Sequence, residues 1–336
     1  MVKKFKARLI SGGIAFLLGT VILTGVVGNY FVNYALVPQH GGQERKVKDP
    51  KQENEGLARR KKEEKEARDR WLTAVKEQTE EVSISSKEGL RLAGHAYRQI
   101  SPTHNWMIVV HGYQSSEEES QILAQHFYQA GYHVLTYSQR GCGKSEGDYI
   151  GMGLLEKEDL KRWTQWVIDQ DADSRVIYHG TSMGGATVLL ASGEQLPDQV
   201  KAIVSDCSYT SIWAIFASEL KARFSLPSFP VLDMARAVGR FRAGYDIKEG
   251  DVEQAVSQSQ LPIFFLHTKE DTFVPVEMVQ SLYQAKTGGQ KDLFIYETGK
   301  HAEAKYHPDY YEKIQSFIEN IKQNKARTFD FKRTSF

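Results

Sequence analysis

The sequence predicts an α/β fold with a mostly parallel, doubly wound sheet. Beyond residue 82, short β-branched and aromatic runs alternate with longer amphipathic segments, and this alternation is typical of parallel strands joined by crossover helices. Strands are expected at 82–85, 90–97, 107–110, 133–137, 176–179, 202–205, 263–267 and 293–297. Helices are expected at 117–130, 156–169, 184–192, 276–285 and 307–321. The first two strands are predicted to form an antiparallel hairpin with Gly89 at its turn.

A long uncharged segment near the N-terminus stands apart from this pattern. Four basic residues, the last of them Arg8, precede an uncharged and largely apolar run over 9–38. About 20 apolar residues are enough for a helix to cross a bilayer, whereas the apolar core of a signal peptide has only about 7–15 residues. Residues 1–38 are therefore predicted to be an uncleaved membrane anchor, with a cleaved signal peptide as the alternative.

The charges around this segment predict its orientation. The basic residues lie immediately before it, and the first charge after it is Glu44. Basic residues favour the cytoplasmic side of a membrane. The chain is therefore predicted to cross the cell membrane once, with the part after residue 38 outside the cytoplasm.

Composition divides the rest of the chain into three parts. Residues 39–81 are rich in charged helix formers and are predicted to be a solvated helical stalk or linker that docks near Trp71. Residues 82–325 carry the α/β pattern, with a cap expected at about 207–260, and 326–336 are expected to be a tail. A chain that begins near Glu55 is therefore expected to be soluble and to keep the function of the α/β part.

Charge and cysteine content argue against several classes of function. The 336 residues include 43 Lys and Arg against 42 Asp and Glu, so no global positive charge favours a nucleic-acid partner. The two cysteines, Cys142 and Cys207, lack the close spacing of a zinc site. We therefore expect no metal ion and no organic cofactor, and the apolar N-terminal segment predicts the membrane as a partner.

A G-x-S-x-G pattern occurs at Gly180-Thr181-Ser182-Met183-Gly184 and is typical of a nucleophilic serine on a sharp strand-to-helix turn. An apolar strand runs into the pattern, and a helix of small residues follows it. The glycines let strand and helix approach closely, and the start of the helix favours developing negative charge. Ser182 is therefore predicted to be a catalytic nucleophile.

A serine hydroxyl needs a base to remove its proton. Asp271 and His301 each follow one of the late predicted strands. Because the carboxyl ends of parallel strands meet at one edge of a sheet, both side chains are expected beside Ser182. His301 is predicted to be the base and Asp271 the acid that orients it, while Asp206 remains an alternative acid and His307 an alternative base.

Acyl transfer also needs N–H donors for the oxyanion of the tetrahedral intermediate. Met183, the residue after the nucleophile, is expected to supply one donor. The second is expected from Tyr113, because the preceding Gly112 lets the backbone turn its next N–H inward. The predicted oxyanion hole is therefore formed by Tyr113 and Met183.

Five stretches carry a family pattern: Val110-His111-Gly112-Tyr113, Ser138-Gln139-Arg140-Gly141-Cys142-Gly143-Lys144-Ser145-Glu146-Gly147, Gly180-Thr181-Ser182-Met183-Gly184, Asp271-Thr272-Phe273-Val274-Pro275 and Gly299-Lys300-His301. Together they resemble the α/β-hydrolase superfamily over about 82–321. The chain is most similar to bacterial membrane-anchored or cell-surface serine hydrolases of the lysophospholipase-like and prolyl-oligopeptidase-like group. This resemblance implies the α/β-hydrolase fold with a small helical cap. Two positions depart from the family pattern: Ser138 stands where an acid is usual, and Thr268 stands where Gly is usual.

The cap contains large apolar side chains, among them Trp213, Phe216 and Phe224. They either line a site for an acyl group or pack the cap onto the body, and both interpretations stay open. The predicted function is a serine hydrolase of the carboxylesterase or lipase-like class, acting on a small-molecule or lipid-like ester. The alternatives are a serine peptidase or amidase of the same fold, and a catalytically silent, membrane-tethered binding domain.

Overall fold

The computed structural model describes residues 2–38 and 55–333. Within these residues, eight strands form one sheet in the order β1-β2-β4-β3-β5-β6-β7-β8. The strands are β1 (Thr79–Ser85), β2 (Arg91–Tyr97), β3 (Asn105–Val110), β4 (His133–Tyr137), β5 (Arg175–Thr181), β6 (Val200–Asp206), β7 (Ile263–Thr268) and β8 (Lys291–Tyr296). β1 and β2 pair antiparallel, as do β2 and β4, and the other pairs are parallel. The predicted hairpin and mostly parallel sheet are confirmed.

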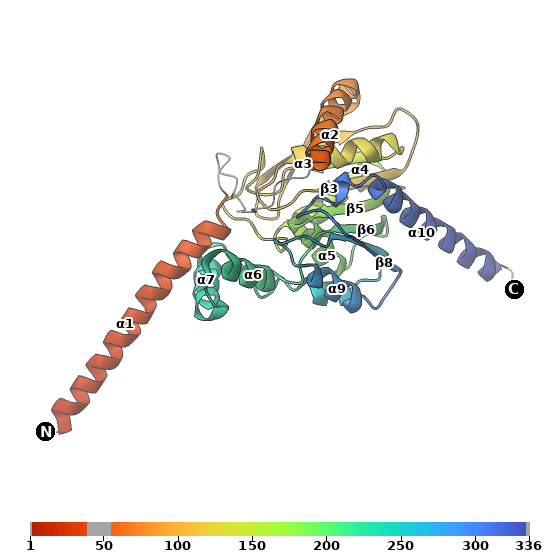
Figure 1. Ribbon diagram of the computed structural model, residues 1–336. Coiled ribbons are helices and arrows are strands. Elements are labelled where there is room, and N and C mark those ends of the chain that lie inside the picture. Colours follow the sequence, from red (N-terminus) through yellow and green to blue (C-terminus); the bar gives the residue numbers. More distant parts are fainter. Residues whose placement is uncertain (1, 39–54, 334–336) are drawn as a thin grey trace.

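Helices cover both faces of the sheet (Figure 1). They are α1 (Val2–Ala35), α2 (Glu55–Ala74), η1 (Lys76–Gln78), α3 (Glu117–Gln129), α4 (Glu156–Gln170), α5 (Met183–Ser192), α6 (Ile212–Phe224), α7 (Ser228–Arg242), α8 (Val252–Gln258), α9 (Val276–Ala285), η2 (Ala304–Tyr306) and α10 (Tyr310–Arg333). Side chains of α4, α5, α8 and α9 pack into one hydrophobic cluster, and those of α2, α3 and α10 pack into a second. Along β3, Ile108 belongs to the first cluster and Met107 and Val109 to the second. The strand is therefore buried on both faces, as expected for a parallel sheet.

Several boundaries differ from those predicted, and two of the differences are explained by the sequence. β1 begins at Thr79 and not at Val82. The earlier start was not predicted because Glu80 and Glu81, at exposed positions of this edge strand, interrupt the apolar alternation. α10 continues to Arg333, into the expected tail. The sequence there contains helix-forming Lys, Ala and Arg and no Gly or Pro.

α2 lies against the body along one side. Lys61 Nζ pairs with Glu303 Oε1 at 2.7 Å. One turn further on, Glu64 Oε2 lies 2.8 Å from His126 Nε2, and Trp71 is buried in the second cluster. These positions share one helix face. Mostly polar contacts along one face of α2 therefore attach the predicted stalk to the body.

α1 extends away from the sheet and joins the body near its C-terminal end (Figure 1). Within the described residues, it is the one helix long and apolar enough to cross a membrane, over Ala15–Ala35 (21 residues). A signal sequence would meet the same criterion. The last turns of α1 lie beside α7 of the cap, so the apolar helix and the cap form a continuous structure.

Candidate active site

The turn between β5 and α5 holds Ser182 in a strained backbone conformation. Its φ is 56° and its ψ is −117°, a combination that residues with a side chain rarely adopt. A Cβ atom on Gly180 would lie 2.2 Å from the Gly184 carbonyl oxygen, and one on Gly184 would lie 2.2 Å from the Val110 carbonyl oxygen. Both positions therefore require glycine, and the turn places Ser182 at the N-terminus of α5.

The loops after β7 and β8 bring Asp271 and His301 to Ser182. His301 Nε2 lies 2.8 Å from Ser182 Oγ, and His301 Nδ1 lies 2.7 Å from Asp271 Oδ2. Because an ionised carboxylate can only accept hydrogen bonds, Nδ1 carries the ring proton and Nε2 can accept the serine hydroxyl. The structure thus joins the three side chains that the sequence singled out into one hydrogen-bonded chain.

Asp271 is held in a fixed orientation as a carboxylate. Its Oδ1 accepts hydrogen bonds from the backbone N–H groups of Phe273 and Val274, both at 2.9 Å. Burial favours the neutral acid, but the His301 ring and the Val274 N–H together hold the pKa of Asp271 below its ordinary value. Asp271 is therefore ionised at neutral pH and can orient His301.

The alternative acid and base have other partners. Asp206 Oδ2 accepts a hydrogen bond from the Tyr310 hydroxyl at 2.9 Å. His307 Nε2 lies 2.9 Å from the Thr298 carbonyl oxygen. Of the candidates considered from sequence, Asp271 and His301 are thus the pair linked to Ser182.

Asp206 has a second property that leads to a prediction about stability. Burial raises its pKa to about 6 from the ordinary 3.8. The folded state therefore binds this proton more tightly than the unfolded state, so the carboxyl costs stability as the pH rises from about 4 to about 6. Asp206→Asn cannot ionise, and it keeps a carbonyl oxygen for Tyr310. The difference of interest is the unfolding free energy of Asp206→Asn minus that of wild type. We expect this difference to be about 1–2 kcal/mol more positive at pH 8 than at pH 5.

Urea denaturation of both chains at the two pH values measures this difference. Asp173→Asn, at an exposed position, is the matched control. A gain for Asp206→Asn that is the same at both pH values would contradict the prediction.

The loop after β3 is fixed beside Ser182 by His111 and Gln139. The Gln139 N–H donates to His111 Nε2 at 2.9 Å, so His111 Nδ1 carries the proton and donates to the Gly112 carbonyl oxygen at 2.8 Å. Burial lowers the pKa of His111, in keeping with this neutral ring. A Cβ atom on Gly112 would lie 3.4 Å from Ser182 Cβ, so the loop touches the nucleophile.

Sequence analysis missed Gln139. Its side-chain amide also donates to the His111 carbonyl oxygen. Its position two residues after β4, within the stretch that carries the family pattern, was the signal that could have identified it. Both predicted oxyanion donors lie near the nucleophile. Met183 follows Ser182 directly and begins α5, and Tyr113 lines the same pocket as Ser182.

Of the two departures from the family pattern, Thr268 makes a hydrogen bond with its side chain and Ser138 accepts one at its backbone carbonyl oxygen. The Thr268 hydroxyl donates to the Lys300 carbonyl oxygen at 2.8 Å, which links the end of β7 to the loop that carries His301. The Ser138 carbonyl oxygen accepts a hydrogen bond from the Ser145 hydroxyl. Thr268 therefore supports the site at a position where the family usually has glycine.

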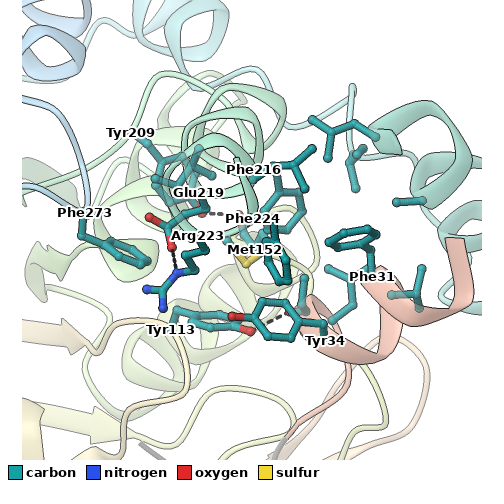
Figure 2. Close-up of a pocket in the computed structure, with 18 of the residues that line it drawn as sticks. Phe31, Tyr34, Tyr113, Met152, Tyr209, Phe216, Glu219, Arg223, Phe224 and Phe273 are labelled. Atoms are coloured by element: carbon teal, nitrogen blue, oxygen red, sulfur yellow. Dashed lines mark hydrogen bonds and ion pairs between the residues drawn. The ribbon is translucent and has the colours of Figure 1, made fainter. Parts of the chain in front are cut away.

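An apolar pocket opens beside Ser182 (Figure 2). Its lining comes from the body, the cap and α1, and comprises Phe31, Val32, Tyr34, Ala35, Leu36, Tyr113, Met152, Ser182, Tyr209, Ile215, Phe216, Glu219, Leu220, Arg223, Phe224, Leu232, Ala235, Ile247 and Phe273. Phe216 and Phe224 thus line the pocket, and both Phe216 and Trp213 pack against the core. Packing of the cap onto the body is therefore observed, and a role of the lining side chains in holding an acyl group stays a prediction.

One group of possible metal ligands occurs among the described residues, and it lies at this site. Ligand atoms of Cys207, Asp271 and His301 all lie within 4.8 Å of one another. Burial raises the pKa of the Cys207 thiol well above its ordinary value, which opposes the thiolate form that binds metals. Asp271 and His301 already pair with each other, so the arrangement fits proton transfer better than metal binding.

Comparisons with known proteins agree with this fold. A family model for the alpha/beta hydrolase fold matches residues 105–232. YqkD of Bacillus subtilis (strain 168) is 30% identical over 243 residues, which cover 71% of this chain and 78% of that protein. Lysophosphatidylserine lipase ABHD12 of Danio rerio is 28% identical over 184 residues, which cover 49% of this chain and 44% of that protein.

Among solved structures, the Pyrococcus furiosus esterase Pf2001 superposes with a TM-score of 0.61 at 22% identity, over 74% of this chain and 95% of that chain. The sheet order, the strained serine turn and the cap define a hydrolase of the α/β class. The chain belongs to the α/β-hydrolase superfamily.

Proposed function

We propose that this hydrolase cleaves a carboxylic ester through an acyl-enzyme, with Ser182 as nucleophile, His301 as base and Asp271 as the orienting acid. The observation that carries the proposal is the continuous hydrogen-bonded chain from Asp271 through His301 to Ser182, with distances of 2.7 and 2.8 Å. Such a chain on a strained serine turn is the arrangement that serine hydrolysis requires.

The proposed mechanism has two steps. Ser182 Oγ attacks the ester carbonyl carbon, and His301 Nε2 takes the hydroxyl proton. The N–H groups of Met183 and Tyr113 stabilise the oxyanion, and His301 returns the proton to the leaving alcohol as the C–O bond breaks. A water molecule then attacks the acyl-enzyme, again with His301 as base, and releases the acid and free Ser182. Asp271 stays ionised and stabilises the His301 cation, in accord with its lowered pKa.

An ester of an acyl group is favoured over a peptide by the apolar lining beside Ser182. The relative named as a lysophosphatidylserine lipase points in the same direction. The runner-up is cleavage of an amide by the same three residues, and the remaining alternative is a silent binding domain. A lipid-like or small acyl ester is thus the proposed partner, and no nucleic acid is proposed.

The hydrolase is proposed to be a single-pass protein of the cell membrane, with its catalytic domain outside the cytoplasm. Support comes from the apolar helix over Ala15–Ala35 and from the basic residues that precede it. Phe241 of α7, 90% exposed, lies beside α1, and a membrane would remove its apolar ring from water. Protease added to intact cells tests the orientation, and full protection of the hydrolase domain would contradict it.

A fluorophosphonate probe tests the proposed chemistry. Wild type should be labelled covalently, because the activated serine attacks phosphorus as it attacks an acyl carbon. Ser182→Ala should not be labelled, whereas the matched control Ser281→Ala, on α9, should be labelled like wild type. A folded wild type that stays unlabelled would overturn the enzyme proposal in favour of the silent binding domain.

A further inference from the structure

The C-terminal end of α1 is fixed to the hydrolase body by specific contacts. The Tyr113 hydroxyl donates to the Ala35 carbonyl oxygen at 2.8 Å, and the Ile150 N–H donates to the Leu36 carbonyl oxygen at 2.7 Å. The side chains of Val32 and Leu36 are buried in the larger hydrophobic cluster. A simple tether needs no such contacts, so this end of α1 is part of the folded domain.

Close packing against the cap fixes the rotation of α1. A Cβ atom on Gly28 would lie 2.4 Å from the Met234 carbonyl oxygen of α7. Gly239 of α7 faces back towards α1, where its Cβ would meet Leu36 at 3.6 Å. The two helix backbones therefore approach closely, and this contact decides which face of α1 is turned towards the pocket.

That face supplies an aromatic wall, formed by Phe31 and Tyr34 of α1 with Phe224 of α6 (Figure 2). Phe31 and Phe224 lie with ring centroids 5.2 Å apart, and so do Tyr34 and Phe224. Both pairs are edge-to-face, which is a favourable geometry for aromatic rings. The wall belongs to the same pocket that contains Ser182.

The charged side chains in the pocket lining compensate each other. Glu219 and Arg223 form an ion pair one helical turn apart, and the Arg223 guanidinium also lies 5.8 Å from the ring centroid of Phe273. Much of the remaining lining, including Val32, Leu36 and Leu232, consists of hydrocarbon side chains. The pocket therefore favours an apolar group over a charged one.

We propose that the last turns of α1, with Phe31, Tyr34 and Ala35, form the wall that binds and selects the acyl chain, and that the substrate is an ester of a long acyl chain. This inference rests on the proposed ester hydrolysis. Each methylene that the wall removes from water strengthens binding roughly fourfold, so a long chain gains most. The structure thereby argues against the expectation that a chain beginning near Glu55 keeps its activity, because it would lack this wall.

The test uses the full-length chain in detergent micelles and the p-nitrophenyl esters of acetate, octanoate and dodecanoate. The measured quantity is the ratio of kcat/KM for dodecanoate to kcat/KM for acetate. Phe31→Ala removes a ring from the wall, and Ala35→Phe fills the space beside it. Each should lower the ratio by about tenfold, since a few methylenes in an apolar pocket are worth that much. Phe16→Ala makes the same change on the same helix, at a side chain that is 78% exposed, and should keep the wild-type ratio.

The outcomes separate this inference from the proposed chemistry. A merely structural effect would lower both rates and leave the ratio unchanged. If wild type is labelled and hydrolyses esters, but Phe31→Ala and Ala35→Phe keep the wild-type ratio, the role of α1 alone is overturned. Wild type that prefers acetate to dodecanoate would overturn the long-chain substrate. Wild type that is neither labelled nor active on any ester would overturn the proposed function itself.

Discussion

A His301→Ala chain is expected to hydrolyse esters with a kcat about 10⁵-fold below that of wild type. The ring is the group within hydrogen-bond distance of Ser182 Oγ that can take its proton, at 2.8 Å. Without it the hydroxyl has no base, and only the oxyanion donors and substrate binding remain to accelerate the reaction. Steady-state hydrolysis of a p-nitrophenyl ester, over a pH range from 6 to about 9, measures the loss.

His307→Ala is the matched control for this change. Its ring lies against the Thr298 carbonyl oxygen, in the loop region after β8, so its kcat should stay within a few-fold of wild type. Asp271→Asn should lose about 10⁴-fold, because an amide no longer fixes the His301 tautomer. A loss for His307→Ala as large as that for His301→Ala would reassign the base.

A Gly184→Ala chain is expected to lose at least about 3 kcal/mol of unfolding free energy. The new Cβ atom would lie 2.2 Å from the Val110 carbonyl oxygen and 2.6 Å from that of His111. Both oxygens belong to the backbone at the end of a central strand, so neither can move aside without distorting the sheet. The loop after this strand carries Tyr113, one of the two proposed oxyanion donors. Fluorophosphonate labelling should therefore fall together with stability.

Urea denaturation measures this loss, with Gly19→Ala as the matched control. A Cβ atom on Gly19 meets nothing within 4 Å, and alanine is the better helix former. Gly19→Ala should therefore unfold at the wild-type urea concentration or slightly above it. A Gly184→Ala chain as stable as wild type would show that the turn between β5 and α5 is not as tightly packed as described.

Sequence patterns were sufficient to predict the residues that meet at the sheet edge. Ser182, Asp271 and His301 each follow a parallel strand, and the topology of the sheet brings such positions together wherever the strands lie in the chain. The distances between their side chains, 2.7 and 2.8 Å, depend on loop conformations that no local pattern specifies. Thr268, which holds the His301 loop, was visible only as a departure from the usual residue.

Docking of the charged segment near Trp71 was predicted and is observed, but the polar contacts of that segment and the contacts of the apolar N-terminal helix were not predicted. The side of α2 that packs on the body carries Lys61 and Glu64, so hydropathy gave it the pattern of a solvated helix. α1 is apolar on every face, and its periodicity therefore gave no sign that Phe31 and Tyr34 turn towards a pocket. In both helices the packing face is defined by the partner surface and not by the pattern along the chain.

The position of α1 beside Ser182 limits how freely this helix can be exchanged. A bilayer responds to the length and hydrophobicity of a spanning helix, so an anchor with no other role can be replaced by almost any apolar segment. The final turns of α1 are instead specified residue by residue, through the contacts of Gly28, Leu36 and the Ala35 carbonyl oxygen. Under the proposed roles of α1, a chimera with a foreign anchor is expected to keep its location in the cell and to lose its preference among substrates. The proposal therefore couples the location of the hydrolase to its selectivity through a single helix.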